Sequence, residues 1–195
     1  LGVRRQRQMC IRDSVCFDGL DWQTQRVILA TVHRRENWGD RLRDIASGML
    51  QVLDRHPDTA LLLPLHRNPT VREPLREMLG DHPRVVLTEP LDYDRLVAAM
   101  RGCTLLLTDS GGLQEEAPAL GKPVLVLRRT TERPEAVEAG TARLVGTEPS
   151  AILEEASRLL DDADAYGAMS RAVNPFGDGQ ASVRILSLCR EHLGV

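Results

Sequence analysis

Short apolar segments alternate with longer amphipathic ones from Val27 onward, and this alternation constrains the fold more than any other feature. Segments rich in Val, Leu and Ile predict strands at 27–33, 60–65, 85–87, 105–108, 124–127 and 142–145. Apolar residues at helical spacing predict helices at 40–55, 70–79, 93–100, 150–160 and 180–193. Strands that alternate with helices form βαβ units, in which parallel strands are buried on both faces. The sequence therefore predicts a doubly wound α/β domain with a parallel sheet.

Periodicity divides the chain of 195 residues into three parts. Residues 1–25 show neither helical nor strand periodicity, and the first residue is Leu1 rather than Met. We expect this head to be foreign or out-of-frame sequence, an expectation that packing against the domain would contradict. Residues 26–173 form the predicted α/β domain. The turn-rich NPFGDG at 174–179 opens a closing segment, 174–195, that ends in a helix.

Composition argues against several classes of function. A formal net charge of −3 does not suit a protein that neutralises nucleic-acid phosphates. No apolar run approaches the roughly 18 residues that span a bilayer, and the charged head lacks the apolar core of a signal peptide. No cluster of His, Asp or Glu has metal-ligand spacing, so we expect no metal and no other cofactor. The four cysteines are Cys10, Cys16, Cys103 and Cys189. They form no C-x-x-C pair, which fits a reduced, cytoplasmic setting.

Residues 105–116, LLLTDSGGLQEE, carry the main indication of function. An apolar strand runs through Asp-Ser-Gly-Gly directly into a helix. Glycines at such a junction let the backbone approach a ligand closely, and the free N–H groups of the helix end then face an anion. Two carboxylates follow, Glu115 and Glu116, of which one can reach sugar hydroxyls while the other complements the helix dipole. The stretch predicts a site for a nucleotide that carries a sugar.

Polar clusters follow four of the predicted strands: HRREN at 33–37, HRNP at 66–69, DSGG at 109–112 and RRTTER at 128–133. Ligands of doubly wound sheets bind beyond the carboxyl ends of the strands. Taken singly, each cluster has a simpler interpretation as a solvated loop, and this holds for His33 in particular. Their common placement favours one shared site.

The chain contains several long motifs: TVHRREN, PLHRNP, LTDSGGLQEEAPALGKPVLVLR, TTERPEAVEAGT and NPFGDGQAS. With these motifs, residues 27–193 resemble the carboxyl-terminal half of the non-hydrolysing UDP-N-acetylglucosamine 2-epimerases. It implies a GT-B-type fold, in which two Rossmann-like domains face each other and the second, present here, holds most of the nucleotide. In that fold the last helix crosses back to the first domain, so 174–179 would be the crossing point.

The resemblance also implies roles for five residues around the nucleotide. Ser110, Gly111 and Gly112 would bind the diphosphate of UDP, which agrees with the helix-end reasoning above. Glu116 would bind the ribose hydroxyls, and Arg133 would hold the nucleotide or a phosphate with its planar guanidinium. Simpler alternatives remain open. Ser110 would then be an ordinary N-cap, Glu116 a plain helix carboxylate, and Arg133 the partner of a neighbouring glutamate.

Two histidines and an arginine correspond to further functional positions of the family. His33 would lie near the phosphates and the reacting sugar, where it stabilises charge or moves a proton. Arg34 and His66 would contact a second, activating UDP-N-acetylglucosamine, although His66 fits a loop histidine bonded to nearby backbone equally well. This chain departs from the family at Leu96, where an aromatic residue usually packs near uracil.

The implied reaction interconverts UDP-N-acetylglucosamine and UDP-N-acetylmannosamine by elimination and re-addition of UDP. The carboxylate acids and bases for this come from the amino-terminal domain, so we expect this fragment to be inert alone and the full-length form to be a homodimer. Three alternatives remain open: a GT-B-type glycosyltransferase, a hydrolysing epimerase, and a non-catalytic module that binds nucleotide sugars.

Overall fold

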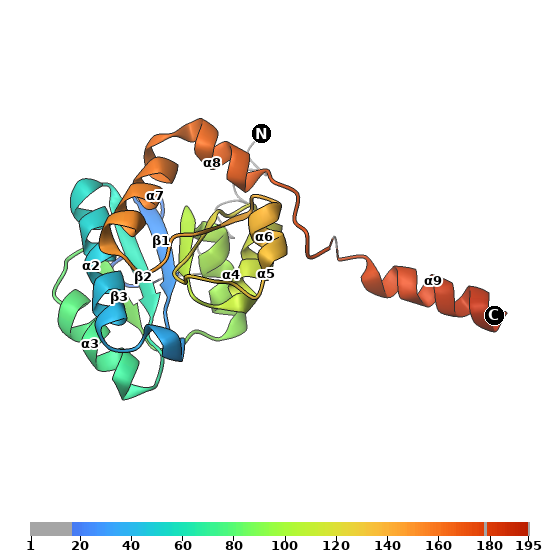
Figure 1. Cartoon of the computed structure of the whole chain (residues 1–195), viewed down its shortest axis with the longest axis horizontal. Coiled ribbons are helices and arrows are strands. Elements are labelled where there is room, and N and C mark those ends of the chain that lie inside the picture. Colours follow the sequence, from blue (N-terminus) through green and yellow to red (C-terminus); the bar gives the residue numbers. More distant parts are fainter. Residues whose placement is uncertain (1–16, 178, 195) are drawn as a thin grey trace.

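The chain folds around a central parallel sheet (Figure 1), seen in a computed structural model that describes residues 17–177 and 179–194. The strands in that part of the chain are β1 (Arg26–Thr31), β2 (Thr59–Pro64), β3 (Val85–Thr88), β4 (Leu105–Thr108), β5 (Val124–Val126) and β6 (Ala142–Leu144). They pair in the order β3-β2-β1-β4-β5-β6, and every pairing is parallel. This order reverses direction between β1 and β4, which is the switch point of doubly wound sheets.

Helices connect the strands and cover both faces of the sheet (Figure 1). They are the 3-10 helix η1 (Arg35–Asn37) and the α-helices α2 (Asp40–Arg55), α3 (Pro69–Leu79), α4 (Tyr93–Gly102), α5 (Gly111–Ala119), α6 (Pro134–Glu138), α7 (Pro149–Asp161), α8 (Ala163–Ser170) and α9 (Ala181–Leu193). Within the described residues, no helix combines the length and the apolar content needed to cross a bilayer.

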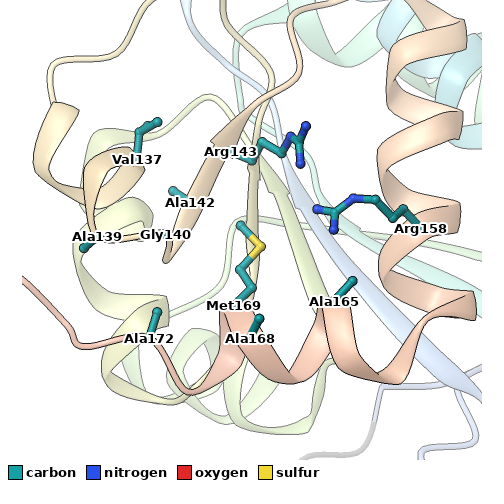
Figure 2. Close-up of a pocket in the computed structure, with 10 residues that line it drawn as sticks. All are labelled: Val137, Ala139, Gly140, Ala142, Arg143, Arg158, Ala165, Ala168, Met169 and Ala172. Carbon is teal, nitrogen blue, oxygen red and sulfur yellow. The ribbon is translucent and has the colours of Figure 1, made fainter.

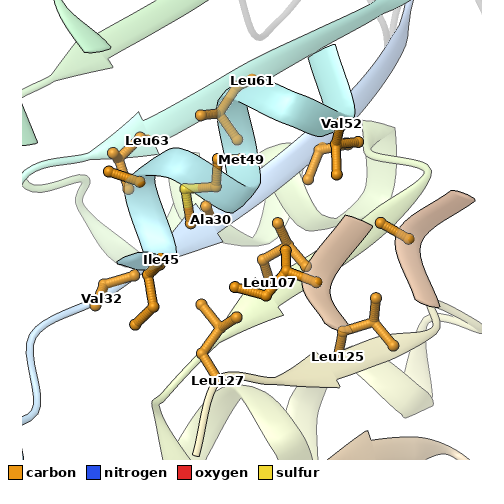
Figure 3. Packing of buried hydrophobic residues seen from close by; sticks show 14 of the residues in the cluster. Ala30, Val32, Ile45, Met49, Val52, Leu61, Leu63, Leu107, Leu125 and Leu127 are labelled. Carbon is orange, nitrogen blue, oxygen red and sulfur yellow. The ribbon is translucent and has the colours of Figure 1, made fainter. Parts of the chain in front are cut away.

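Alternating strand residues divide the core into two halves, one on each face of the sheet. Ile28 and Ala30 of β1 point to one face, where α2 and α7 pack (Figure 3), and Leu29 points to the other. The side chains of strand β4 alternate in the same way, with Leu107 on the first face and Leu106 on the second. Because side chains alternate along a strand, only strands that are apolar at every position can be covered on both faces. This confirms the predicted fold class.

The structure departs from the expected elements in two respects. Strand β1 ends at Thr31 rather than at residue 33, because the amides of His33 and Arg34 bind the Asp109 carboxylate instead of a neighbouring strand. Helices α6 and α8, together with η1, were not expected. They have 5, 8 and 3 residues, so none is long enough to show an amphipathic period in the sequence.

Part of the predicted head packs against the domain. Phe17 is only 4% exposed and belongs to the core on the face that α4 and α5 cover. The Trp22 ring lies against Gly102 so closely that a Cβ at that glycine would lie 2.7 Å from it. This packing argues against a foreign origin for residues 17–25. Residues 1–16 lie outside the described part of the chain, and for them the expectation stays a prediction.

The closing helix α9 extends away from the domain (Figure 1). Its apolar side chains are exposed, with Val183 at 61%, Leu186 at 52% and Leu193 at 71%. The crossing role of residues 174–179 stays a prediction.

His56 joins α2 to α7 at the opposite end of the sheet from the carboxyl ends of the strands. It follows α2, is 5% exposed, and its Nε2 lies 2.9 Å from the Ser157 hydroxyl. Its Nδ1 lies 3.5 Å from an Asp161 carboxylate oxygen. Desolvation by burial lowers the pKa of His56 below its ordinary 6.5, and Asp161 only partly opposes this.

We predict that His56 makes the domain less stable in mild acid. Since the pKa of His56 is lower in the folded than in the unfolded chain, its contribution to the free energy of unfolding is complete above about pH 6.5. Below that value the contribution is lost, by at most about 1.4 kcal/mol per pH unit. Urea unfolding of the chain between pH 5 and 8 measures this slope. His56→Gln, which keeps a partner for Ser157, should flatten it, whereas His192→Gln on the exposed α9 should not. Equal slopes in all three proteins would contradict the prediction.

Candidate functional site

The loops that follow β1 and β4 meet at the switch point of the sheet. Thr31 and Thr108 end these two strands as paired residues, and their hydroxyl oxygens lie 2.7 Å apart. The chain then continues into the HRREN loop on one side and into DSGG on the other. The structure therefore brings two of the four predicted polar clusters together at the position where doubly wound sheets bind ligands.

A buried carboxylate joins these two loops. Asp109 is fully buried and accepts hydrogen bonds from the backbone N–H of His33 at 3.0 Å and of Arg34 at 2.8 Å. The side-chain amide of Asn37 donates to it at 3.0 Å, and also to the backbone carbonyl of Leu127 at 3.1 Å. A buried carboxylate is tolerated only with such donors. Asp109 thus fixes the loop after β1 relative to the amino-terminal end of α5.

The Ser110 side chain does not cap the amino-terminal end of α5. Ser110 precedes the helix with extended backbone, and its side chain makes no capping hydrogen bond. Its N–H instead donates to the Thr108 hydroxyl at 2.9 Å. The amides of Gly111, Gly112 and Leu113 follow, and the first N–H groups of a helix have no partner within it. These three amides, with the positive end of the helix dipole, lie where the sequence predicted an anion site, and that role stays a prediction.

A network of ion pairs lies beside Gly111. Arg128 is 6% exposed, and its Nε donates to Glu36 at 2.5 Å while its Nη1 donates to Glu132 at 3.0 Å. Glu132 also pairs with Arg34 at 3.2 Å. A Cβ at Gly111 would lie 3.5 Å from both the Arg34 Nη2 and the Glu132 Oε2, an ordinary van der Waals distance, so this ion pair lies directly beside the glycine. The pKa of Arg128 is raised, mainly by its hydrogen bond to Glu36. The pKa of Glu132 is lowered, mainly by its hydrogen bond from Arg128.

Arg133 approaches the same helix from the loop after β5. Its Nε pairs with Glu115, not with the side chain of either neighbouring glutamate, which was the alternative that the sequence left open. Its backbone N–H donates to the Thr131 hydroxyl at 3.0 Å, which in turn donates to Gln114 at 2.5 Å. Gln114 donates to the Ser110 carbonyl at 3.1 Å. This chain of hydrogen bonds fixes the loop against the start of α5.

Two polar atoms at the site are buried without a partner among the described residues: the Oε2 of Glu116 and the Nε of Arg34. The other Glu116 carboxylate oxygen, Oε1, lies 3.9 Å from the position that a Cβ at Gly112 would take. A buried polar atom without a partner is unfavourable unless something else satisfies it. An acceptor on Glu116 and a donor on Arg34 are therefore left unsatisfied by the described residues.

His33 and His66 lie next to each other with stacked rings. Their centroids are 5.7 Å apart and the ring planes differ by 14°. The His33 Nδ1 lies 3.2 Å from Asp109, and the His33 side chain is 36% exposed. His66 accepts a hydrogen bond at Nδ1 from the backbone N–H of Asn68 at 3.1 Å, as the loop-histidine alternative expects. The loop after β2 thus joins those after β1, β4 and β5 at one edge of the sheet.

All the residues predicted for the site therefore lie at this edge. Leu96 packs on the core from α4. Sequence reasoning did not assign roles to Asp109, Asn37, Glu36 and Arg128. A signal existed for Asp109, because a carboxylate directly after a buried strand needs donors from another segment. For the other three the decisive contacts join residues far apart in sequence, and no local pattern indicates them.

A cavity of about 410 Å³ lies elsewhere, between α6, β6, α7 and α8 (Figure 2). Gly140 and Ala142, at the start of β6, line it, so it faces away from the carboxyl ends of the strands. Its two arginines, Arg143 and Arg158, both pair with Glu155. It does not contribute to the site at α5. In the described part of the chain, no group of three or more His, Cys, Asp or Glu side chains could hold a metal ion.

Comparison with known proteins identifies the family of this arrangement. Residues 5–190 match the family model described as UDP-N-acetylglucosamine 2-epimerase. The chain belongs to the UDP-N-acetylglucosamine 2-epimerase family. A probable UDP-N-acetylglucosamine 2-epimerase from Ralstonia solanacearum is 55% identical over 161 residues, which are 83% of this chain and 43% of that protein. The members of this family are named as isomerases, and the resemblance found in the motifs is confirmed.

Two solved structures of the family superpose closely. The S. aureus MnaA–UDP co-structure has a TM-score of 0.86 at 44% identity, over 93% of this chain and 50% of that one. The UDP-GlcNAc 2-epimerase from Neisseria meningitidis, bound to UDP-GlcNAc, has a TM-score of 0.85 at 41% identity, over 95% and 49%. They confirm the Rossmann-like domain of a GT-B-type fold. The chain spans about half the length of these epimerase relatives.

We predict that Arg128 stabilises the site more than a surface ion pair would. Arg128→Met removes the shared cation of Glu36 and Glu132 and should lower the free energy of unfolding by about 1–3 kcal/mol, less than for fully buried partners. Arg43→Met is the matched control, because its partner Glu77 is 68% exposed, and should change it by less than about 0.5 kcal/mol. Urea unfolding measures both. If both variants lose the same free energy of unfolding, the Arg128 network stabilises the domain no more than an exposed ion pair does.

Proposed function

We propose that this chain supplies the UDP-binding half of a non-hydrolysing UDP-N-acetylglucosamine 2-epimerase, which interconverts UDP-GlcNAc and UDP-ManNAc. The observation that carries the proposal is the amino-terminal end of α5, which lies at the switch point without a side-chain cap from Ser110, together with the unpartnered Glu116 oxygen. Membership of the epimerase family supports it, as do two relatives, one solved with UDP and one with UDP-GlcNAc.

The diphosphate of UDP would bind at the amides of Gly111 and Gly112, with the Ser110 side chain free to add a hydrogen bond. Glu116 would accept hydrogen bonds from the ribose hydroxyls, which supplies the partner that its buried oxygen lacks. Arg133 would turn from Glu115 to the nucleotide, since a guanidinium exchanges one pair of oxygens for another at little loss.

In the proposed epimerisation, the role of this half of the enzyme is to bind an anion rather than to supply the base. Carbon two of the sugar bears a proton of low acidity, so loss of UDP accompanies its removal and gives a 2-acetamidoglucal. UDP then adds back while a proton arrives on the opposite face. Holding UDP throughout this cycle is what the helix end provides, because fixed amides stabilise the charge of the departing diphosphate. The carboxylates that act at carbon two would belong to the other half.

His33 would act beside the diphosphate, by stabilising charge or by moving a proton. Arg34, whose Nε lacks a partner, and His66, stacked on His33, would contact a second UDP-GlcNAc that activates the enzyme. We further propose that the full-length protein is a homodimer that acts in the cytoplasm.

The binding role of Glu116 has a direct test. We predict that Glu116→Gln weakens UDP binding about 10-fold or more, because one acceptor for the ribose hydroxyls is lost. The unmodified chain should bind 2′-deoxy-UDP more weakly than UDP. The Glu116→Gln variant should bind the two ligands with nearly equal affinity, since the variant and the altered ligand remove the same contact. Isothermal titration calorimetry measures the four affinities. Glu154→Gln, on α7, is the control and should bind like the unmodified chain. If the losses of binding free energy from the altered ligand and from the variant simply add, Glu116 does not contact the ribose hydroxyl.

Turnover should require the other half. We predict that the purified chain binds UDP weakly and forms no UDP-ManNAc, because the carboxylates that act at carbon two are absent. Adding the amino-terminal half of the N. meningitidis relative should restore measurable epimerisation, followed by NMR of the sugar. The same mixture with His33→Asn should be far less active. Turnover by the chain alone would contradict the division of roles.

A further inference from the structure

The ring nitrogens of His33 and His66 have different neighbours, although the two rings are stacked. The His33 Nδ1 faces Asp109 Oδ1 at 3.2 Å, whereas the His66 Nδ1 accepts a backbone N–H. We propose that Asp109 is a positioning residue that holds neutral His33 with its proton on Nδ1, so that Nε2 is the nitrogen that exchanges a proton at the site. Its importance for turnover rests on the function proposed above.

Asp109 is well suited to impose one tautomer because its own orientation is fixed. Both of its carboxylate oxygens accept hydrogen bonds from the backbone N–H of His33, at 3.1 and 3.0 Å. Its Oδ2 also accepts from the Arg34 N–H at 2.8 Å and from Asn37 at 3.0 Å. Asp109 is fully buried, so water does not compete for these positions. The carboxylate therefore cannot rotate away from the imidazole.

The short distance between Nδ1 and Oδ1 decides where the proton lies. If Nδ1 carried no proton, its lone pair would face a lone pair of the carboxylate oxygen at 3.2 Å, and the two would repel. With the proton on Nδ1 the same contact is attractive. In proteins, a carboxylate or carbonyl that accepts a hydrogen bond from one ring nitrogen usually decides whether the other nitrogen carries a proton.

His66 should have the opposite tautomer. Its Nδ1 accepts the N–H of Asn68 at 3.1 Å, so in the neutral ring the proton must lie on Nε2. The two stacked histidines thus present different groups: His33 an unprotonated Nε2, and His66 an Nε2–H donor. Of the two, only His33 would accept a proton at Nε2 when neutral, which gives His33 and His66 separate roles at one edge of the sheet.

The unmodified chain can be tested directly, without UDP. Long-range proton–nitrogen correlation spectra of the ¹⁵N-histidine-labelled chain, at about pH 8 where an ordinary imidazole is neutral, report which nitrogen is protonated. His33→Gln and His66→Gln assign the signals. We expect His33 to be protonated at Nδ1 and His66 at Nε2. A His33 with its proton on Nε2, or an even mixture of tautomers, would overturn the proposal.

Asp109→Asn provides the variant test. The Asn oxygen can retain the backbone donors, which places its NH₂ group opposite the His33 Nδ1, where it can only donate. The His33 tautomer should therefore invert to Nε2–H, whereas a role limited to holding the loop would leave it unchanged. Asp161→Asn is the matched control, because it lies beside a different histidine, His56, and should not alter His33.

An unchanged Nδ1–H in folded Asp109→Asn would overturn the assignment. If this variant does not fold, the spectrum of the unmodified chain still decides. Failure of UDP to bind in calorimetry would count against the proposed function alone, since the tautomer is measured without ligand. The two proposals can therefore fail separately.

Discussion

The site depends on one buried contact, between the Asp109 carboxylate and the backbone amides of His33 and Arg34. A carboxylate that is removed from water must have donors, and here they come from a loop 75 residues away in sequence. The position of β1 next to β4 brings that loop within reach. Satisfying the charge of Asp109 therefore requires the same arrangement that opens the start of α5 and places His33 beside it. The geometry of the two loops and the position of the α5 helix end thus both depend on the pairing of β1 with β4.

Three arginines of the site already have carboxylate partners, which affects how an anion would bind. Arg34 pairs with Glu132, Arg128 with Glu36 and Glu132, and Arg133 with Glu115. In the proposed function, attraction for a diphosphate would thus come first from uncharged N–H groups, which need no counter-ion and do not rearrange. This agrees with a chain whose net charge is −3. An arginine that turns to a ligand releases a carboxylate to solvent, so each guanidinium is exchanged between partners rather than newly desolvated.

Much of the fold could be predicted because buried parallel strands are apolar at every position and their helices are long. Leu61, Leu62 and Leu63 of β2 show this, as does the regular spacing of Leu42, Ile45 and Met49 in α2. The end of β1 could not be predicted, since it depends on Asp109. The short helices α6 and α8 have too few residues for a period. At the site, Ser110–Gly112 carry a local signal, whereas Arg128 shows its role only through partners such as Glu36, 92 residues away.

The pairing of β1 with β4 also constrains how the chain can be made. Thr31 and Thr108, the residues at the ends of these central strands, are 77 positions apart. During synthesis on a ribosome, β1 would therefore leave the exit tunnel with one long edge unpaired and would stay so until β4 emerged. Non-local parallel pairing is intrinsically slow, and unpaired apolar edges are prone to association. Strand β1 would therefore stay exposed to pairing with other chains until β4 had left the tunnel as well.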